Sequence, residues 1–450
     1  MIKINYYGKH DLKGQMKKSN IVLIAALFVT LAFMCSSSAE VLTLTDGLRI
    51  AVEDNKLIKI SEQDELISEA DTLVAKSPML PRVNASLGYT FLSDQPGAVF
   101  GTQTVNTAEK GFLSYSLSVQ QTLYDFRKNA ARYEVSRTVL NTRRLDTARI
   151  RNLIALEFVT RYFDLLEADK MVLVTQKEVE QLELHFRNAK TMYDEGVITK
   201  NELLQAEVKI SDARQRLLTA GSLRALTASR LNNIISRPLK TDIQPAEVED
   251  PSHDISALEL EDAWQMAERL RPEIGIVYET ATALELEKTA RRSEYFPVFF
   301  ARGGYDYTEN EYQLHEGNWS LVLGMHINIF NGRGTSAELL KIGHQKEKLL
   351  EQKNRLFDDI KLEVEKYVLD AKTAREKISV TENAVQQAEE NLRINRIRYD
   401  EGMGTASDVL DAVTLLTTAQ TNYYRAVYDL RKAEAGVMYS TGQDLSEVYK

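Results

Sequence analysis

The fold of this chain is decided by one stretch, YDEGMGTASDVLDA at residues 399–412. A weaker copy, YDEGVITKNELLQA at residues 193–206, lies 206 residues upstream. In both copies a long helical pattern runs into the glycine, which readily takes the left-handed conformation that ends a helix. A second helical pattern starts after the threonine, whose side chain can cap the amides of the new helix. Each copy therefore predicts the tip of a helical hairpin, and the chain contains two.

The composition indicates a folded protein with long uninterrupted elements, because the 450 residues are 44% apolar and 27% charged with only 8 Pro and 21 Gly. Near the N-terminus, lysines precede the apolar run Ile21–Met34, and the small residues Ser37, Ser38 and Ala39 follow it. This pattern predicts a secretory signal peptide at residues 1–39, with Met16 as an alternative start.

Cys35 is the only cysteine, so a lipid-anchored cysteine is an alternative to cleavage after Ala39. Ala32-Phe33-Met34 before it lacks the small residue that a lipoprotein peptidase prefers. Cleavage after Ala39 would leave no cysteine, which excludes disulfides and thiol chemistry. The mature chain would carry 51 basic and 64 acidic residues, a net charge of −13, which argues against a nucleic-acid partner.

Four segments alternate apolar residues with small or polar ones, at about 82–92, 112–124, 297–308 and 319–330. The pattern predicts two β-hairpins, the first with a loop at Ser93–Lys110. The half-buried sheet of a soluble domain is one interpretation. The strand lengths, near those of tilted transmembrane strands, favour membrane strands instead. No segment after the signal has 18 consecutive apolar residues, so any membrane contact would use these strands.

Between the strand pairs the pattern is helical. A helix opens at Leu44, breaks near Asp54-Asn55 and stops before Pro78, and the stretch from Lys128 to about Tyr193 lacks any helix-ending residue. Apolar residues recur there every seven positions, which predicts coiled-coil packing over roughly 100 Å. The same plan returns in the second half. We therefore divide the chain into a first repeat (40–236, tip about 193–201), a linker (237–262), a second repeat (263–442, tip about 399–407) and a tail (443–450).

Four strands cannot close a barrel, and an open edge in lipid would leave backbone groups without hydrogen bonds. The helical seams are likewise too long for one protomer to cover. Both arguments predict a ring of identical subunits, with a strand barrel at one end and a helical tube below it.

The chain resembles the TolC family of outer-membrane efflux and secretion ducts. The resemblance lies in GMGTASDVLDA at 402–412, FNGR at 330–333 and LYDF at 123–126, in that order in a duplicated chain. It implies a mostly α fold with membrane β. Three protomers would build one twelve-stranded β-barrel in the outer membrane, continuous with a periplasmic α-helical barrel. A small equatorial domain would surround the tube near 54–56, 271–272, the linker and the C-terminal end.

The resemblance also implies a function and partners. The protein would be the passive exit duct of a tripartite efflux pump or a type I secretion system. It would be a homotrimer in outer-membrane lipid, opened by a periplasmic adaptor and an inner-membrane transporter of the RND or ABC type. No cofactor is expected. The alternatives are a periplasmic adaptor or structural coiled-coil protein, which usually has one helical hairpin, and an enzyme, for which no convergent polar site is found.

Candidate functional residues gather at the tips. Asp408 and Asp411 are three apart on one helix face, and the family's matching pair points into the narrow pore entrance. A threefold axis would make two carboxylate rings that favour cations and raise each other's pKa. Two solvated helix-start acids are the simpler alternative. The matches at Tyr399 and Glu202 imply a lock that holds the entrance shut, although Gly404 stands where the best-known member carries a lock arginine.

The tip loops are the expected contact for the adaptor, through Gly196, Val197, Ile198, Thr199, Gly402, Met403, Gly404 and Thr405. The six histidines show no metal-binding spacing. We therefore expect His185, His326 and the others to be surface or lumen residues, and we expect no metal site.

Overall fold

The computed structural model describes residues 40–248 and 258–449. The predicted signal peptide, with Met16 and Cys35, lies outside the described residues. So do residues 249–257 of the predicted linker and Lys450 of the predicted tail.

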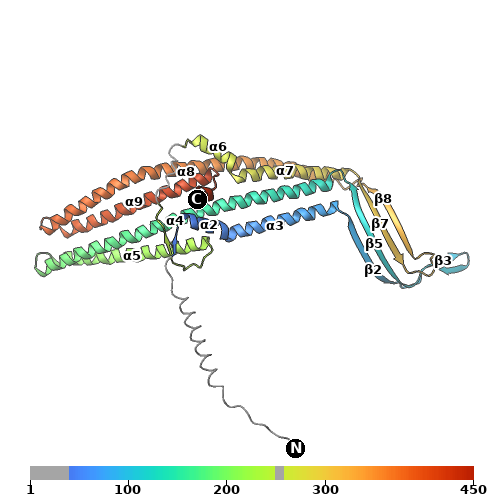
Figure 1. Cartoon of the computed structure of the whole chain (residues 1–450), viewed down its shortest axis with the longest axis horizontal. Helices are drawn as coiled ribbons and strands as arrows, with labels where there is room; N and C mark the ends of the chain where they lie inside the picture. Colours follow the sequence, from blue (N-terminus) through green and yellow to red (C-terminus); the bar gives the residue numbers. More distant parts are fainter. Residues whose placement is uncertain (1–39, 249–257, 450) are drawn as a thin grey trace, which may run out of the picture.

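Two long helical hairpins dominate the structure, and Figure 1 shows them lying side by side along the long axis. In the first, α4 (Lys128–Asp194) is followed by α5 (Lys200–Ile234); in the second, α8 (Gly334–Asp400) is followed by α9 (Ala406–Ser440). The outgoing helices have 67 residues each and the returning ones 35. A helix of that length spans roughly 100 Å. Among the described residues, no helix is both long and apolar enough to cross a membrane.

Shorter helices precede each strand pair and extend the bundle beyond the returning helices, toward the sheet (Figure 1). They are α2 (Leu44–Asp54) and α3 (Lys56–Lys76) in the first repeat, and α6 (Leu260–Leu270) and α7 (Pro272–Arg292) in the second. The predicted break near Asp54-Asn55 is confirmed. The Asn55 side chain accepts the amide of Leu57 and donates to the carbonyl of Ile234 at 2.9 Å, so it both starts α3 and ties it to α5.

The four main strands form one antiparallel sheet in the order β2-β5-β7-β8, at the end opposite the hairpin tips (Figure 1). They are β2 (Arg82–Phe91), β5 (Gly111–Tyr124), β7 (Val298–Thr308) and β8 (Gly317–His326). The register aligns Leu117 with Tyr305 and Tyr305 with Trp319, which places the apolar residues of all strands on one face.

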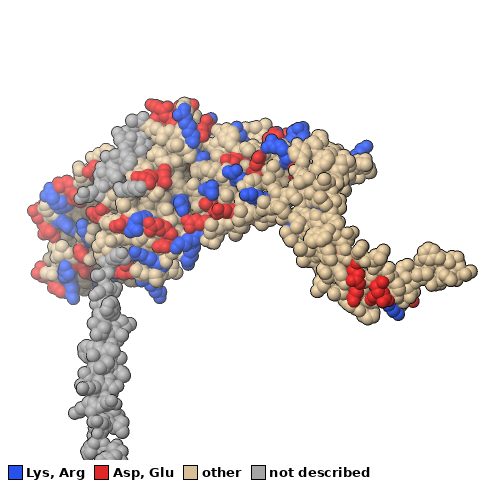
Figure 2. Space-filling view, turned by 45° about the vertical axis from the view of Figure 1, so that its right-hand side comes forward, with Lys and Arg blue, Asp and Glu red and all other residues tan. Residues whose placement is uncertain are grey.

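The sheet contains far fewer charged residues than the helices. The four strands carry only three charged residues, Arg82, Arg302 and Asp306. Figure 2 shows Lys, Arg, Asp and Glu dispersed over the helical part of the visible face, whereas most of the strand region there has none. The predicted alternation therefore produces an exposed apolar surface, which a water-soluble domain would normally bury.

One predicted strand end was wrong, and the predicted loop, linker and tail contain elements that the sequence did not predict. The last strand ends at His326 rather than near 330, because His326 pairs with Val298 and the preceding Pro297 has no amide hydrogen to extend the ladder. The loop Ser93–Lys110 contains a small hairpin, β3 (Gly97–Phe100) and β4 (Gln103–Asn106). The supposed linker includes β6 (Ile243–Pro245) and the start of α6, and the tail forms a short helix, α10 (Leu445–Val448).

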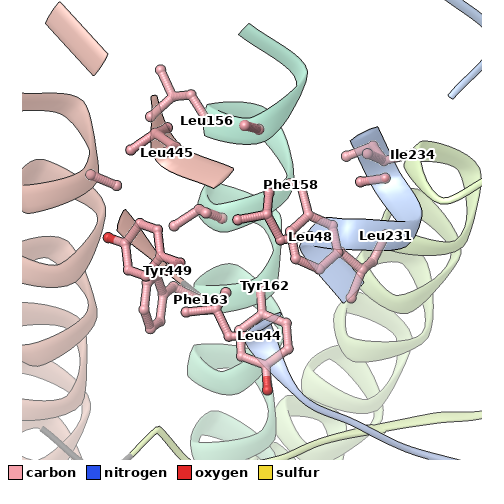
Figure 3. Close-up of a cluster of buried hydrophobic side chains, with 14 of the residues drawn as sticks. Leu44, Leu48, Leu156, Phe158, Tyr162, Phe163, Leu231, Ile234, Leu445 and Tyr449 are labelled. Atoms are coloured by element: carbon pink, nitrogen blue, oxygen red, sulfur yellow. The ribbon is translucent and has the colours of Figure 1, made fainter. Parts of the chain in front are cut away.

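The largest core lies where the shorter helices meet the middle of the bundle. There β1 (Glu40–Leu42) pairs in parallel with β6, and the hydroxyl of Tyr162 on α4 donates to the carbonyls of Leu42 and Ala246 at 2.9 and 2.8 Å. Figure 3 shows Phe158, Tyr162 and Phe163 of α4 among side chains from α2, α5 and α10. This equatorial core joins α4 and α5 of the first hairpin to α9 of the second.

Candidate functional site: the two hairpin tips

Both hairpin tips are built from the same backbone turn. Gly196 and Gly402 have φ of 76° and 72°, in the left-handed region. The amide after each glycine bonds back across the helix end, from Val197 to the carbonyl of Met192 at 2.8 Å and from Met403 to that of Arg398 at 2.7 Å. This is a Schellman ending, which satisfies carbonyls that would otherwise lack partners.

Each returning helix begins with a capping box. At the first tip the hydroxyl of Thr199 accepts the amide of Glu202 at 3.4 Å, and the carboxylate of Glu202 accepts the amide of Thr199 at 3.5 Å. At the second tip the corresponding bonds between Thr405 and Asp408 are shorter, 3.2 and 2.9 Å. The loop between the two helices is therefore closed at both ends by local hydrogen bonds.

Asp408 and Asp411 lie on the exposed side of α9, whereas Val409, Leu410 and Ala412 between and beside them are buried. The pKa of Asp408 is lowered, first by its hydrogen bonds to the backbone and side chain of Thr405 and then by the charge of Arg398. The expected rise of pKa concerns a ring of three protomers and stays a prediction. Within one protomer the effect has the opposite sign, so Asp408 is held ionised as a helix cap.

Tyr399 is buried beneath the second tip, with 4% of its surface exposed. Its hydroxyl makes no hydrogen bond within the described residues, and the carboxylate of Glu202 bonds to Thr199 instead. Burial, the nearby charge of Glu202 and that of Asp400 raise the pKa of Tyr399. The structure therefore brings Tyr399 and Glu202 near one another without the direct bond that a lock would use, and the lock stays a prediction.

The second tip is anchored by an apolar cluster, here called the tip cluster, to which all four long helices contribute. Its buried members are Val179, Leu182, Ile210, Ala213, Ala388, Leu392, Tyr399, Ala406, Val409, Leu410, Ala412, Val413, Leu416 and Ala419. Because small alanines alternate with larger residues on α9, the helices approach closely along this seam. The cluster joins the second hairpin to α4 of the first.

Comparison with known proteins identifies the family of the chain. Residues 48–237 and 283–443 match the family described as outer membrane efflux protein. The chain belongs to this family. It is also 20% identical over 433 residues to the alkaline protease secretion protein AprF of Pseudomonas aeruginosa, covering 93% of this chain and 88% of AprF.

Solved structures have the same fold. The outer-membrane channel OprN matches with a TM-score of 0.78 at 14% identity, over 90% of each chain. The CmeC outer membrane channel of Campylobacter jejuni matches with a TM-score of 0.78 at 15% identity, over 89% of this chain and 85% of CmeC. The predicted duplicated TolC-like protomer is thus confirmed.

Membership of the outer membrane efflux protein family decides the broad function. The protein is an outer-membrane exit duct for efflux or secretion that extends into the periplasm. The family is one of channels rather than enzymes. The alternative of a periplasmic adaptor or a structural coiled-coil protein is therefore set aside.

The backbone around Gly404 leaves little room for a side chain. A Cβ atom on Gly404 would lie 3.2 Å from the amide nitrogen of Tyr399 and 3.3 Å from Arg398, so a larger residue there would require a small shift. Arg398 instead spans the loop, and its guanidinium donates to the carbonyl of Met403 at 3.4 Å. The loop's positive charge thus comes from the outgoing helix, which the sequence analysis missed.

The remaining tip residues lie where an approaching protein could touch them. Val197 and Met403 are 65% and 63% exposed. The capping threonines Thr199 and Thr405 are exposed as well, as are Gly196 and Gly402, whereas Ile198 and Gly404 are half-buried. Adaptor contact through these residues stays a prediction.

His185 corrects another expectation. We expected a surface or lumen residue, but His185 is 5% exposed and packs against Tyr399. Helical spacing could have revealed this position, because His185 lies three residues after the buried Leu182 and four before the buried Ala189 on α4. Within residues 40–248 and 258–449, no group of three or more His, Cys, Asp or Glu could hold a metal ion.

Proposed function

We propose that this exit duct is passive, is made of three copies of the chain, and is gated at the second hairpin tip. The observation that carries the gate is the placement of Asp408 and Asp411, exposed side by side on α9 directly above the tip cluster. Three such pairs around an axis would form two carboxylate rings, which favour cations at a constriction.

Unpartnered surfaces support the trimer. The sheet order leaves β2 and β8 each with one unpaired edge, and joining β2 to β8 of the next copy would remove both edges. On α3, apolar residues at helical spacing remain exposed, including Leu57, Ile60 and Ile67 at 56%, 58% and 60%. A second copy would bury the exposed apolar residues of α3. A closed ring of strands in outer-membrane lipid would pair the free edges of the sheet.

The equatorial domain of this trimer would consist of the core around β1 and β6, the helix breaks at Asn55 and Arg271, and α10. Arg271 is buried and ion-paired with Glu273 and Glu363. Ion pairs therefore stabilise the helix break at Arg271, whereas the side-chain amide of Asn55 stabilises the first break. The described part of the 237–262 linker would belong to this domain.

Opening would follow contact of the tip loops with a periplasmic adaptor that links the duct to an inner-membrane transporter of the RND or ABC type. AprF is named for protease secretion, which favours an ABC-type secretion partner, whereas the fold shared with CmeC and OprN is compatible with efflux. Affinity capture of the whole chain from membranes, followed by identification of the inner-membrane protein retained, would separate the two transporter classes.

The gate is tested by planar-bilayer conductance of the purified trimer. Replacing both acids, Asp408→Asn with Asp411→Asn, should reduce the ratio of cation to anion permeability severalfold. Asparagine can still accept the amide of Thr405, so the capping of α9 is largely preserved. The matched control, Asp194→Asn with Glu195→Gln, removes two charges from the first tip and should leave selectivity unchanged. Equal selectivity of both double variants would overturn the assignment of the constriction.

A further inference from the structure

His185 and Tyr399 form an unusual contact between the two hairpins. His185 lies on α4 and Tyr399 near the end of α8, and their ring centroids are 5.0 Å apart with a 53° tilt. They are 5% and 4% exposed. Nε2 of His185 and the hydroxyl of Tyr399 are both buried without a hydrogen-bond partner in the described part of the chain.

Two unsatisfied polar atoms in one contact are costly, because each loses its bonds to water without gaining another. Such a contact persists only where the surrounding packing holds it, here the tip cluster. It also makes the closed arrangement sensitive to the charge of the imidazole, because a buried cation costs more than a buried neutral ring.

The charged groups around the pair come from several helices. On α8, Arg396 opposes a positive charge on His185 and Asp400 favours one. On α5, Glu202 acts on Tyr399. On α9, Asp408 and Asp411 are exposed, and the buried residues near them are apolar. Burial is the largest effect and Arg396 the next, and together they lower the pKa of His185 below its ordinary value of 6.5.

We propose that His185 is a proton-sensitive gating residue, neutral when the second hairpin packs against α4 and protonated when that contact opens. The proposal rests on the proposed gate at the second tip. When the hairpins separate, the imidazole reaches water and can bind a second proton at the ring nitrogen that lacks one. The charged ring, facing Arg396, then opposes reclosure.

The direction with pH follows from linkage. The contact is fully stabilising above the ordinary histidine pKa of about 6.5 and weakens as the pH falls toward the lowered pKa of the closed state. Between these two values the equilibrium between open and closed tips shifts by up to about tenfold per pH unit. The duct should therefore open more readily in a mildly acidic periplasm.

Of the two matched positions in the described repeats, only the first carries a histidine. The counterpart of His185 in the second repeat, 206 residues later, is Asn391 on α8. The side chain of Asn391 is exposed. Only the contact that joins the second hairpin to α4 therefore carries a titratable ring at this position, as expected for a residue that acts on the moving hairpin.

The test compares open probability of the purified trimer in planar bilayers at pH 7.5, 6.5 and 5.5. Wild type should open progressively as the pH falls. His185→Phe keeps a ring in the contact and should abolish this dependence, whereas His185→Arg carries a permanent charge and should open at all three values. His344→Gln is the matched control, because His344 is an exposed histidine on α8 and should leave the profile unchanged.

Hydrogen exchange of the α8 and α9 tip amides at the same pH values gives a second readout and reports whether each variant keeps its fold. Exchange that accelerates in acid in wild type but not in His185→Phe supports the proposal. A pH profile that is the same in wild type and His185→Phe overturns it, while the selectivity test of Asp408 and Asp411 still stands. A wild-type channel with no closed state at any pH overturns the gate itself.

Discussion

The two hairpin tips share their local chemistry and differ in what surrounds it. Both end the outgoing helix with a left-handed glycine and start the returning one with a threonine capping box. Their counterparts diverge in burial: Leu204 is 48% exposed and Leu410 2%, and Tyr193 is 36% exposed and Tyr399 4%. The same residues in the same turn therefore end up outside in one repeat and inside in the other.

The difference lies in the tertiary packing. α9 packs along α4 in the same protomer, whereas α5 pairs chiefly with α4 and leaves its other side uncovered. Turn geometry is thus encoded locally, and burial is decided by the neighbouring hairpin. A tip that is held by packing rather than by its own turn can be released without unfolding.

The largest expected difference between the tips comes from their leucines. Leu410→Ala should lower the local opening free energy of the first turns of α9 by about 2–5 kcal/mol, because it leaves a cavity in the tip cluster. Leu204→Ala should change the same α9 amides by no more than about 0.5 kcal/mol. Hydrogen exchange of the trimer measures both. Equal effects would mean that the two tips are packed alike.

Replacing a glycine by alanine should lower the stability in one returning helix and raise it in the other. Gly436 on α9 is buried, and an added Cβ would lie 2.1 Å from the ring of Tyr367, so Gly436→Ala should destabilise by about 1–3 kcal/mol. Gly221 on α5 has nothing within 4 Å, so Gly221→Ala should stabilise by up to about 1 kcal/mol. Thermal unfolding followed by circular dichroism measures both. A loss of stability in Gly221→Ala would contradict the open surface assigned to α5.

Removal of the two capping threonines should give the smallest difference in local stability between the tips. Thr405→Ala and Thr199→Ala should each cost about 0.5–2 kcal/mol of local stability, with Thr199 at the lower end because its bonds are longer.

Loss of Thr405 should also raise the pKa of Asp408 toward its ordinary 3.8. Because the folded pKa is lowered, the stabilisation by the ionised carboxylate is present above 3.8 and is lost as the pH falls through the folded pKa. Hydrogen exchange of the second tip at pH 3 to 5 measures this. An unchanged pH dependence in Thr405→Ala would exclude the threonine as the cause.

Sequence alone predicted the elements well where each one is marked by its own residues. The glycine and threonine of each tip act on their immediate neighbours, and the heptad from Phe158 to Tyr193 requires a helix whatever it packs against. The alternation in the strands likewise identified the apolar face without any knowledge of the partner strand.

Partnership between distant elements could not be predicted in this way. The alanine seams of α5 and α9 look alike in sequence, so nothing indicated that α9 would pack along α4 of the other hairpin while α5 packs chiefly on α4 of its own. The burial of His185 and the loop contact of Arg398 depend on that packing. The end of β8 was missed for a related reason, because Pro297 limits it from the opposite strand.

The equatorial core joins the two extremes of the described chain. Leu42 and Leu44 share it with Leu445 and Tyr449, and the hydroxyl of Thr45 donates to the carbonyl of Tyr449 at 2.9 Å. A polypeptide delivered to the periplasm from its N-terminus onward cannot complete this core until its final helix has crossed. Truncated chains would lack part of the equatorial core, so we expect proteases to degrade them before they can assemble.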